Sequence, residues 1–263
     1  MLNYHFLKDK LNTEYVGRSF IQFESLQSTA KKASTIASHS PNGMVVCADK
    51  QWENKTKRNK EWFSPQGGLY LSIILDLDRK KNYFCLLTLL GGSAVFHTLK
   101  DMGVSPVLKW PNDIMIHDKK LGAIFVDGIT CDNIEKYILS INLNIDIDRE
   151  MLADSLDNQA ISLMAIYNSD IVMEDMVAML LNHVDDLIGE CYGKKSCDRI
   201  YEPWEQYLSQ FANHVQLRKH GNKKWMECKI IGFNNCGELG FIQPSGNTDI
   251  IDPQKYEVIM TKE

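Results

Sequence analysis

The feature that most constrains the fold is the segment Lys109–Gly122, which reads KWPNDIMIHDKKLG. Ile114–Ile116 is strand-forming, a polar turn follows at His117–Lys119, and a second apolar run begins at Lys120. The sequence therefore predicts a β-hairpin that is preceded by a turn at Pro111. Alternation with a period of two places Lys120 and Gly122 on one face, where the missing side chain lets a ligand approach the backbone.

Charged and polar groups concentrate in the same segment. Two ammonium groups, an amide and a carboxylate stand among apolar strand residues, at Lys109, Asn112, Asp113 and Lys120. Such a set can bind an anion and hold charge in a fixed place. On spacing alone a second interpretation stays open. In it the two lysines are solvated charges, and Trp110-Pro111 is buried and anchors the loop.

The remaining patterns predict a mixed sheet with helices, an α+β fold. Strand patterns occur at Phe20–Phe23, Met44–Cys47, Gly68–Leu77, Val107–Trp110, Asp113–His117, Lys120–Val126 and Tyr137–Leu143. Helical patterns occur at Thr29–Ser38, Leu86–Met102, Ile171–Glu190 and Asp198–Phe211. The third helix repeats apolar residues in the manner of a core helix. No glycine-rich turn of the Rossmann or P-loop kind occurs, so any nucleotide is bound by other means.

From about residue 212 the pattern changes to short strands separated by turn residues. They are Val215–Arg218, Lys224–Ile231, Gly237–Ile242, Thr248–Ile251 and Tyr256–Met260. Short strands in such close succession predict a small β-barrel. We therefore expect two domains, residues 1–212 and residues 213–263, which suits a chain of 263 residues that is 44% hydrophobic.

Composition excludes several classes of function. A net charge of −5 argues against a general nucleic-acid surface, so the basic stretch at residues 55–60 is either a local anion site or a solvated loop. The 7 cysteines lack zinc-ligand spacing and suit a reducing compartment. The sequence shows no signal peptide and no apolar run of about 20 residues, the length that spans a bilayer. We expect a cytoplasmic protein that binds neither nucleic acid nor membrane.

Several elements, in the same order, resemble the biotin protein ligases. KWPND and the KLG after it match the signature hairpin of that family. The other matching elements are Ser28-Thr29, Gln51 followed by the basic loop, Trp62–Pro65 with the strand Gly67–Ser72, the strand Ser140–Asn144 (SINLN) and the segment Ala160–Leu163 (AISL), which resembles a helix start of that family. The resemblance implies a class II synthetase-like biotin/lipoate ligase catalytic domain followed by an SH3-like barrel. Only residues 1–19 precede it, so we expect a monofunctional ligase without an N-terminal DNA-binding domain.

The resemblance also implies roles for single residues. Catalysis is expected from Lys120, Asp113 and Asn112, with Lys120 bridging the biotin carboxylate and the α-phosphate of ATP, although Asp113 can equally serve as a turn carboxylate. Biotin is expected to contact Ser28, Thr29, Gln51, Trp62 and Gly122. ATP and its phosphates are expected to contact Lys55, Lys57, Arg58, Lys60, Lys109 and Asn142. No protein-held metal is expected, because Mg²⁺ would arrive with ATP.

The basic loop departs from the family pattern. Where the family has three glycines, this chain has Asn54, Thr56 and Asn59, and lysines replace all but one of the arginines. Glycine lets a backbone with positive φ aim its N–H groups at an anion, whereas β-branched threonine resists that conformation. Lysine binds phosphate as a point charge and not through a planar fork. The loop therefore keeps its positive charges but lacks the glycines that would let its backbone N–H groups point at a phosphate.

The function predicted from the sequence is an ATP-dependent biotin–protein ligase. It would form biotinyl-5′-AMP and transfer biotin to a lysine of a biotin carboxyl carrier domain. A lipoate or octanoate ligase or transferase stays open, but it needs a pocket for a long apolar chain, against which Ser28, Thr29 and Gln51 weigh. A catalytically impaired biotin-binding protein also stays open, since it would explain Thr56. The oligomeric state is undecided, and a homodimer is one option.

Overall fold

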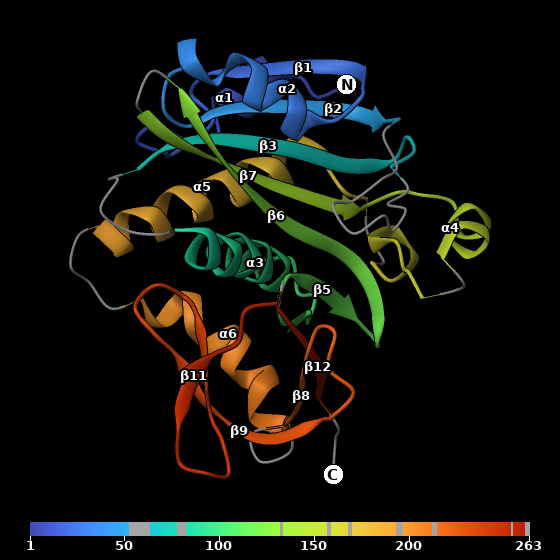
Figure 1. The fold of residues 1–263 in the computed structure, drawn as a ribbon. Coiled ribbons are helices and arrows are strands. Elements are labelled where there is room, and N and C mark those ends of the chain that lie inside the picture. Colours follow the sequence, from blue (N-terminus) through green and yellow to red (C-terminus); the bar gives the residue numbers. More distant parts are fainter. Residues whose placement is uncertain are drawn as a thin grey trace.

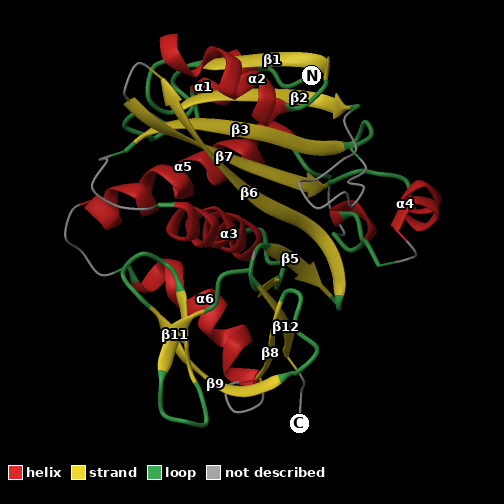
Figure 2. Ribbon diagram, in the orientation of Figure 1, coloured by secondary structure: helices red, strands yellow, loops and turns green. Residues whose placement is uncertain are grey.

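The computed structural model of the chain describes residues 1–52, 64–77, 83–131, 134–156, 159–167, 170–192, 197–211, 215–253 and 255–260. These residues form a seven-stranded sheet and a five-stranded sheet. Figure 1 and Figure 2 show three long helices below the larger sheet, the lowest of which lies against the smaller sheet. None of the described helices is long and apolar enough to cross a membrane.

The larger sheet is mixed, as the strand patterns predict. Its strands are β1 (Phe20–Leu26), β2 (Met44–Gln51), β3 (Gly68–Asp76), β4 (Val107–Lys109), β5 (Asp113–Ile116), β6 (Lys119–Cys131) and β7 (Ile134–Asn144), in the order β1-β2-β3-β7-β6-β5-β4. β1 pairs with β2 in parallel, and every other neighbouring pair is antiparallel. The mixed α+β prediction is therefore confirmed, with β6 and β7 longer than their sequence patterns.

Helices cover both faces of this sheet. The long helices α3 (Phe84–Asp101), α5 (Met173–Tyr192) and α6 (Asp198–Leu208) share a large apolar core with one face. The opposite face carries α2 (Thr29–Ile36), which continues into a 3₁₀ turn at Ala37–His39 and packs on a smaller cluster. Because apolar layers cover both of its faces, β2 is buried along its first five residues.

The apolar stripe of α5 lies in the core, as its spacing predicts. Met176, Val177, Leu180, Leu181, Val184 and Leu187 are all buried. α5 also holds the N-terminal segment, which includes the short helix α1 (Tyr4–Lys8). The carboxylate of Asp185 accepts hydrogen bonds from the backbone N–H groups of Glu14, Tyr15 and Val16 at 2.7, 3.3 and 3.0 Å. The N-terminal segment is thus fixed by a polar side of α5.

Two helices, α1 and α4 (Arg149–Leu156), have no counterpart in the sequence patterns. Two further 3₁₀ turns lie at Leu163–Ala165 and Ser209–Phe211. The segment AISL, expected to begin a helix, instead places Ala160 in a β-bridge before the turn at Leu163.

The C-terminal strands form the smaller sheet. They are β8 (Val215–Lys219), β9 (Met226–Phe233), β10 (Leu239–Ile242), β11 (Thr248–Ile250) and β12 (Tyr256–Met260), in the order β11-β10-β9-β8-β12. The predicted short strands are confirmed, while closure into an SH3-like barrel and a boundary at residue 212 remain predictions. The turn after β9 packs on α3, since a Cβ at Gly237 would lie 2.7 Å from Cα of Leu86.

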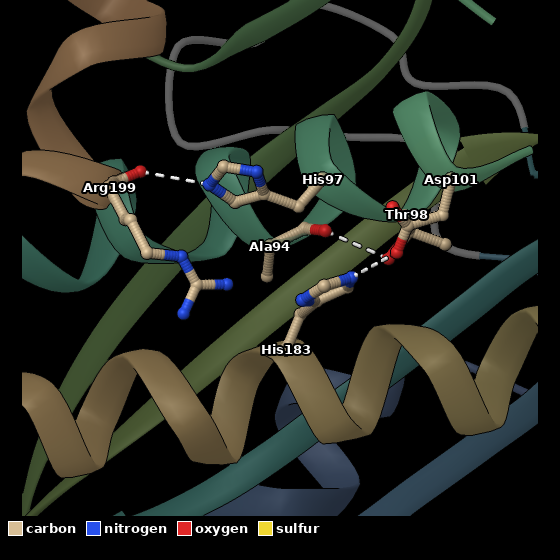
Figure 3. A network of polar contacts seen from close by, with 6 residues as sticks. All are labelled: Ala94, His97, Thr98, Asp101, His183 and Arg199. Carbon is tan, nitrogen blue, oxygen red and sulfur yellow. Dashed lines mark hydrogen bonds and ion pairs between the residues drawn. The ribbon is translucent and has the colours of Figure 1, made fainter. Parts of the chain in front are cut away.

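Helices α3, α5 and α6 meet at a polar network (Figure 3). His97 Nε2 on α3 lies 3.0 Å from the carbonyl oxygen of Arg199 on α6. His183 Nε2 on α5 lies 2.8 Å from Asp101 Oδ2 at the end of α3. The two imidazole rings face each other with centroids 5.6 Å apart. These contacts fix the three helices that support the sheet from below.

Candidate functional site

The predicted hairpin is present and brings two of the expected site residues together. Its turn consists of His117 and Asp118, with φ of 49° and 59°, the conformation of a tight two-residue hairpin turn. Lys119, expected in the turn, is the first residue of β6. Lys120 Nζ lies 2.6 Å from Asp113 Oδ1, and the two side chains are 31% and 27% exposed. The ion pair is therefore held in one place yet open to a ligand.

The backbone of Lys120 is fixed as well, by a neighbouring segment of the chain. Its N–H donates to the carbonyl of Gln159 at 2.8 Å, and its carbonyl accepts from the N–H of Ile161 at 3.0 Å. These bonds form a parallel bridge between Lys120 and Ala160. A cation on such a framework keeps its position without reorganisation when a ligand binds.

Asn112 and Trp110 brace the entry to the hairpin. Asn112 Nδ2 donates to the carbonyl of Ile124 at 2.9 Å, and the N–H of Ile124 donates to the carbonyl of Asn112 at 3.0 Å. Trp110 precedes a cis peptide bond to Pro111 and is 9% exposed within the main core. Lys109 is exposed and lies opposite Asp113 in the β4–β5 register. Asn112 thus has a structural bond, and Lys109 adds a second cation near the pair.

Gly122 allows two strands to approach closely. A Cβ there would lie 2.3 Å from the carbonyl oxygen of Asn142 and 2.5 Å from the side chain of Leu143. The space beside Gly122 is thus occupied by β7.

A second group of polar residues gathers where α2 begins. The N–H and Oγ1 of Thr29 both donate to Gln51 Oε1, at 2.8 and 3.1 Å. Gln51 Nε2 donates to Ser64 Oγ at 3.3 Å. Ser28 caps α2 by accepting a hydrogen bond from the N–H of Lys31. Thr29 is 1% exposed, whereas Ser28 and Gln51 are partly exposed.

Two serines that the sequence prediction did not include complete this group. Ser72 Oγ on β3 donates to Thr29 Oγ1 at 2.9 Å and lies 2.8 Å from Ser140 Oγ on β7. Both serines are buried. Antiparallel pairing places Ser72 opposite Ser140. The signal for Ser140 lay in the alternation of Ser140, Asn142 and Asn144, which puts the three side chains on one face of β7.

Asn142 and Asn144 continue that face toward the end of β7. They are 8% and 1% exposed. Among the described residues, Asn142 Oδ1 and both polar side-chain atoms of Asn144 have no hydrogen-bond partner. Buried polar atoms are nearly always satisfied in folded proteins, so these amides are suited to receive a ligand. Asn144 was not among the expected site residues.

A cavity of about 400 Å³ lies at the end of β7, beside the segment that bridges to Lys120. Its lining includes Lys119, Asp146, Arg149, Ile161 and Ser162. Ser162 Oγ bonds to the carbonyl of Ile145 and the N–H of Ile147, which holds this wall together. Two cationic side chains at a concave surface favour an anionic ligand.

The basic loop and one tryptophan belong to the part of the chain that the structure does not describe. Lys55, Lys57, Arg58, Lys60 and Trp62 all lie outside the described residues. Gln51 and Ser64, which are described on either side, bond to each other through Gln51 N–H and Ser64 O at 2.9 Å. In the described part of the chain no group of three or more His, Cys, Asp or Glu side chains is placed to hold a metal ion.

Comparison with known proteins relates this arrangement to one family. The Biotin/lipoate A/B protein ligase family profile matches residues 20–146. The bifunctional ligase/repressor BirA of Bacillus subtilis is 33% identical over 219 residues, which are 79% of this chain and 65% of the relative. Biotin–protein ligase 2 of Arabidopsis thaliana is 27% identical over 158 residues, 56% of this chain and 46% of the relative. The chain thus spans about two thirds of the Bacillus relative and less than half of the Arabidopsis one.

Solved structures show the same fold. Biotin protein ligase from Aquifex aeolicus in complex with biotin and ATP has a TM-score of 0.72 and 20% identity, covering 93% of this chain and 100% of that chain. Biotin protein ligase from Leishmania major in complex with biotinyl-5-AMP has a TM-score of 0.59 and 19% identity, covering 89% of this chain and 99% of that chain.

Proposed function

Because the chain belongs to the biotin protein ligase family, we propose that it is an ATP-dependent ligase that forms biotinyl-5′-AMP and transfers biotin to a protein lysine. The acceptor is a biotin carboxyl carrier domain. In the first step a biotin carboxylate oxygen attacks the α-phosphorus of ATP, and pyrophosphate leaves. In the second step the carrier amine attacks the acyl carbon, and AMP leaves.

The observation that carries the proposal is the fixed ion pair of Lys120 and Asp113. Biotin carboxylate and the α-phosphate are both anions, and their repulsion opposes the first step. A cation held between them removes that barrier and stabilises the charge of the transition state. Lys120 can do this because both its N–H and its carbonyl are bonded to the segment 159–161, and because Asp113 holds its ammonium group.

The polar group at the start of α2 supports recognition of the biotin ureido ring. Gln51 Oε1 receives two bonds from Thr29, and one Nε2 hydrogen goes to Ser64, so within the described part of the chain one N–H is left for a ligand. Ser28 accepts from Lys31, so its O–H proton is also available as a donor. Two such donors suit the ureido carbonyl oxygen, which must be paired when it is buried.

ATP is assigned to the other end of the site. The cavity with Lys119 and Arg149, together with Asn142 and Asn144, offers cations and unsatisfied amides to a nucleotide. Lys109 and the loop cations Lys55, Lys57, Arg58 and Lys60 belong to the same proposal as phosphate ligands. Mg²⁺ would enter with ATP and neutralise charge on the phosphates.

A lipoate or octanoate ligase is the second candidate. Its substrate has a long apolar tail and no ureido head. The buried hydroxyls of Thr29, Ser72 and Ser140 beside Gln51 disfavour an apolar tail in this place, because their hydrogen bonds need polar neighbours.

The test is biotin-dependent pyrophosphate release from ATP. We expect release by the native chain, weak competition by lipoate, and a loss on the order of 100-fold or more in Lys120→Ala, the size expected when a preorganised charge is removed. Lys100→Ala, which removes an exposed lysine at the end of α3, is the matched control. Biotin binding without pyrophosphate release would show a binding protein instead, and preference for lipoate would show the second candidate.

A further inference from the structure

A chain of hydroxyl groups runs through the larger sheet beneath α2. It leads from Ser140 on β7 through Ser72 on β3 to Thr29, and it ends at the carboxamide of Gln51. Ser72, Thr29 and Ser140 are 0%, 1% and 3% exposed, whereas Gln51 is partly exposed. Of these four residues, only Gln51 is open to a ligand in this structure.

The hydroxyl protons in this row of hydrogen bonds can point in one direction only. The backbone N–H of Thr29 donates to the Gln51 oxygen at 2.8 Å, and an amide nitrogen cannot accept, so this atom is Oε1. An amide oxygen cannot donate, so the bond between Thr29 Oγ1 and Oε1 uses the Thr29 proton. Ser72 then donates to Thr29, and Ser140 donates to Ser72. Each hydroxyl proton has one assigned acceptor.

The donor-to-acceptor direction of these hydrogen bonds fixes the orientation of the Gln51 carboxamide. Its Oε1 is occupied by two donors of Thr29, and Ser64 takes one hydrogen of Nε2. Hydrogen bonds in a row polarise one another, so each upstream hydroxyl strengthens the bond that holds Gln51. We propose that Ser72 and Ser140 are positioning residues, which act through Thr29 to aim the remaining N–H of Gln51 at the ligand carbonyl. The proposal rests on the biotin site described under the proposed function.

The experiment is a double-mutant cycle on the affinity for biotin, measured by titration calorimetry with the whole 263-residue chain. Ser72→Ala should weaken binding roughly three- to tenfold, the range for one neutral hydrogen bond. Thr29→Val keeps the shape of the side chain and its backbone N–H but cuts the chain of hydroxyls. In the Thr29→Val background, Ser72→Ala should therefore cause no further loss. Ser140→Ala should behave in the same way, with a smaller effect.

Ser93→Ala is the matched control. Ser93 is also a fully buried serine with one hydrogen bond, to the carbonyl of Ile200 at 2.7 Å, and it lies on α3. It should lower stability as Ser72→Ala does and leave the affinity for biotin unchanged. The proposal is overturned when Ser72→Ala binds biotin as tightly as the native protein. It is equally overturned when the loss persists in full without the Thr29 hydroxyl.

A second measurement needs no ligand. The N–H of Thr29 is bonded to Gln51 Oε1, so its hydrogen exchange in the unliganded protein reports how firmly Gln51 is held. Exchange at Thr29 should be faster in Ser72→Ala than in the native protein and in Ser93→Ala, and equal rates would overturn the positioning role. A native protein that binds no biotin would refute the proposed function, and the exchange rates would still decide whether the chain of hydroxyls holds Gln51.

Discussion

Asp113 helps to orient the Lys120 ammonium group, because its carboxylate lies 2.6 Å from Lys120 Nζ. Asp113→Asn keeps the size of the side chain and removes its charge. We expect slower pyrophosphate release with a smaller loss than in Lys120→Ala, because the cation remains but is less firmly placed. The free energy of unfolding should change little, since a partly exposed ion pair contributes about 0–1 kcal/mol. An unchanged rate would show that Asp113 is a turn carboxylate without a part in catalysis.

His97 makes the stability of the protein depend on pH. Burial lowers the pKa of His97 below its ordinary value of 6.5, although the hydrogen bond to the Arg199 backbone opposes this. The unfolded chain therefore binds a proton more readily than the folded one, so stability present above pH 6.5 is lost as the pH falls below it.

The change His97→Gln tests this dependence, because glutamine can still donate to the Arg199 carbonyl but does not titrate. Urea unfolding at about pH 7.5 and about pH 5.5 should show a smaller acid loss of stability in the variant than in the native protein. Equal losses in the two proteins would mean that other groups cause the acid dependence.

The sequence predicted the local hairpin that carries Lys120 and Asp113 and missed the contacts that depend on strand register. Lys120 and Asp113 lie within one short motif and meet across its hairpin, so the motif was enough to select both residues, although not to show their ion pair. Ser72 and Ser140 are 68 positions apart and meet only because β3 and β7 pair in one register. Nothing in the sequence near either serine specifies that register, so the hydroxyl chain required the fold.

At the scale of elements, Asp185 joins the N-terminal segment to α5. Its three hydrogen bonds to backbone N–H groups would all be lost in Asp185→Ala, leaving those groups to water or unpaired. We expect a loss of about 1–3 kcal/mol in the free energy of unfolding. Hydrogen exchange at residues 14–16 should rise in the same variant.

The neighbouring carboxylate provides the control. Asp186 is exposed on the same helix turn, so Asp186→Ala makes the same change of charge without touching the N-terminal segment. Equal destabilisation by both changes would attribute the effect to charge on α5 and not to the three hydrogen bonds.

The helices that the sequence patterns missed are those without an apolar stripe of their own. α1 has five residues and buries only Leu7, so its existence depends on contacts with α5. α4 is capped by Asp148, which accepts from Glu150 N–H at 2.7 Å, yet its Met151 is exposed. Periodicity detects a buried stripe and not a cap, which explains why the core helices were found and these two were not.

At the scale of the whole molecule, Gly237 joins the smaller sheet to α3. Its φ is +75°, and a Cβ there would lie 2.7 Å from both N and Cα of Leu86. Gly237→Ala should therefore lower the free energy of unfolding by about 1–3 kcal/mol, through backbone strain and forced separation of the turn from α3. Gly246→Ala also has a positive φ but no atom within 4 Å of its Cβ, so it isolates the strain. Equal effects of the two changes would exclude a tight contact at the joint.

The continuous apolar core has a consequence for how the molecule unfolds. Buried residues of the smaller sheet, Val215, Leu217 and Phe241 among them, belong to the same cluster as those of α3, α5 and the larger sheet. Two parts that share one interior cannot melt independently, because opening either exposes the apolar surface of the other to water. Calorimetric heating should therefore give a single peak whose calorimetric and van't Hoff enthalpies agree. A substitution far out in the C-terminal strands would then lower the melting temperature of the whole protein.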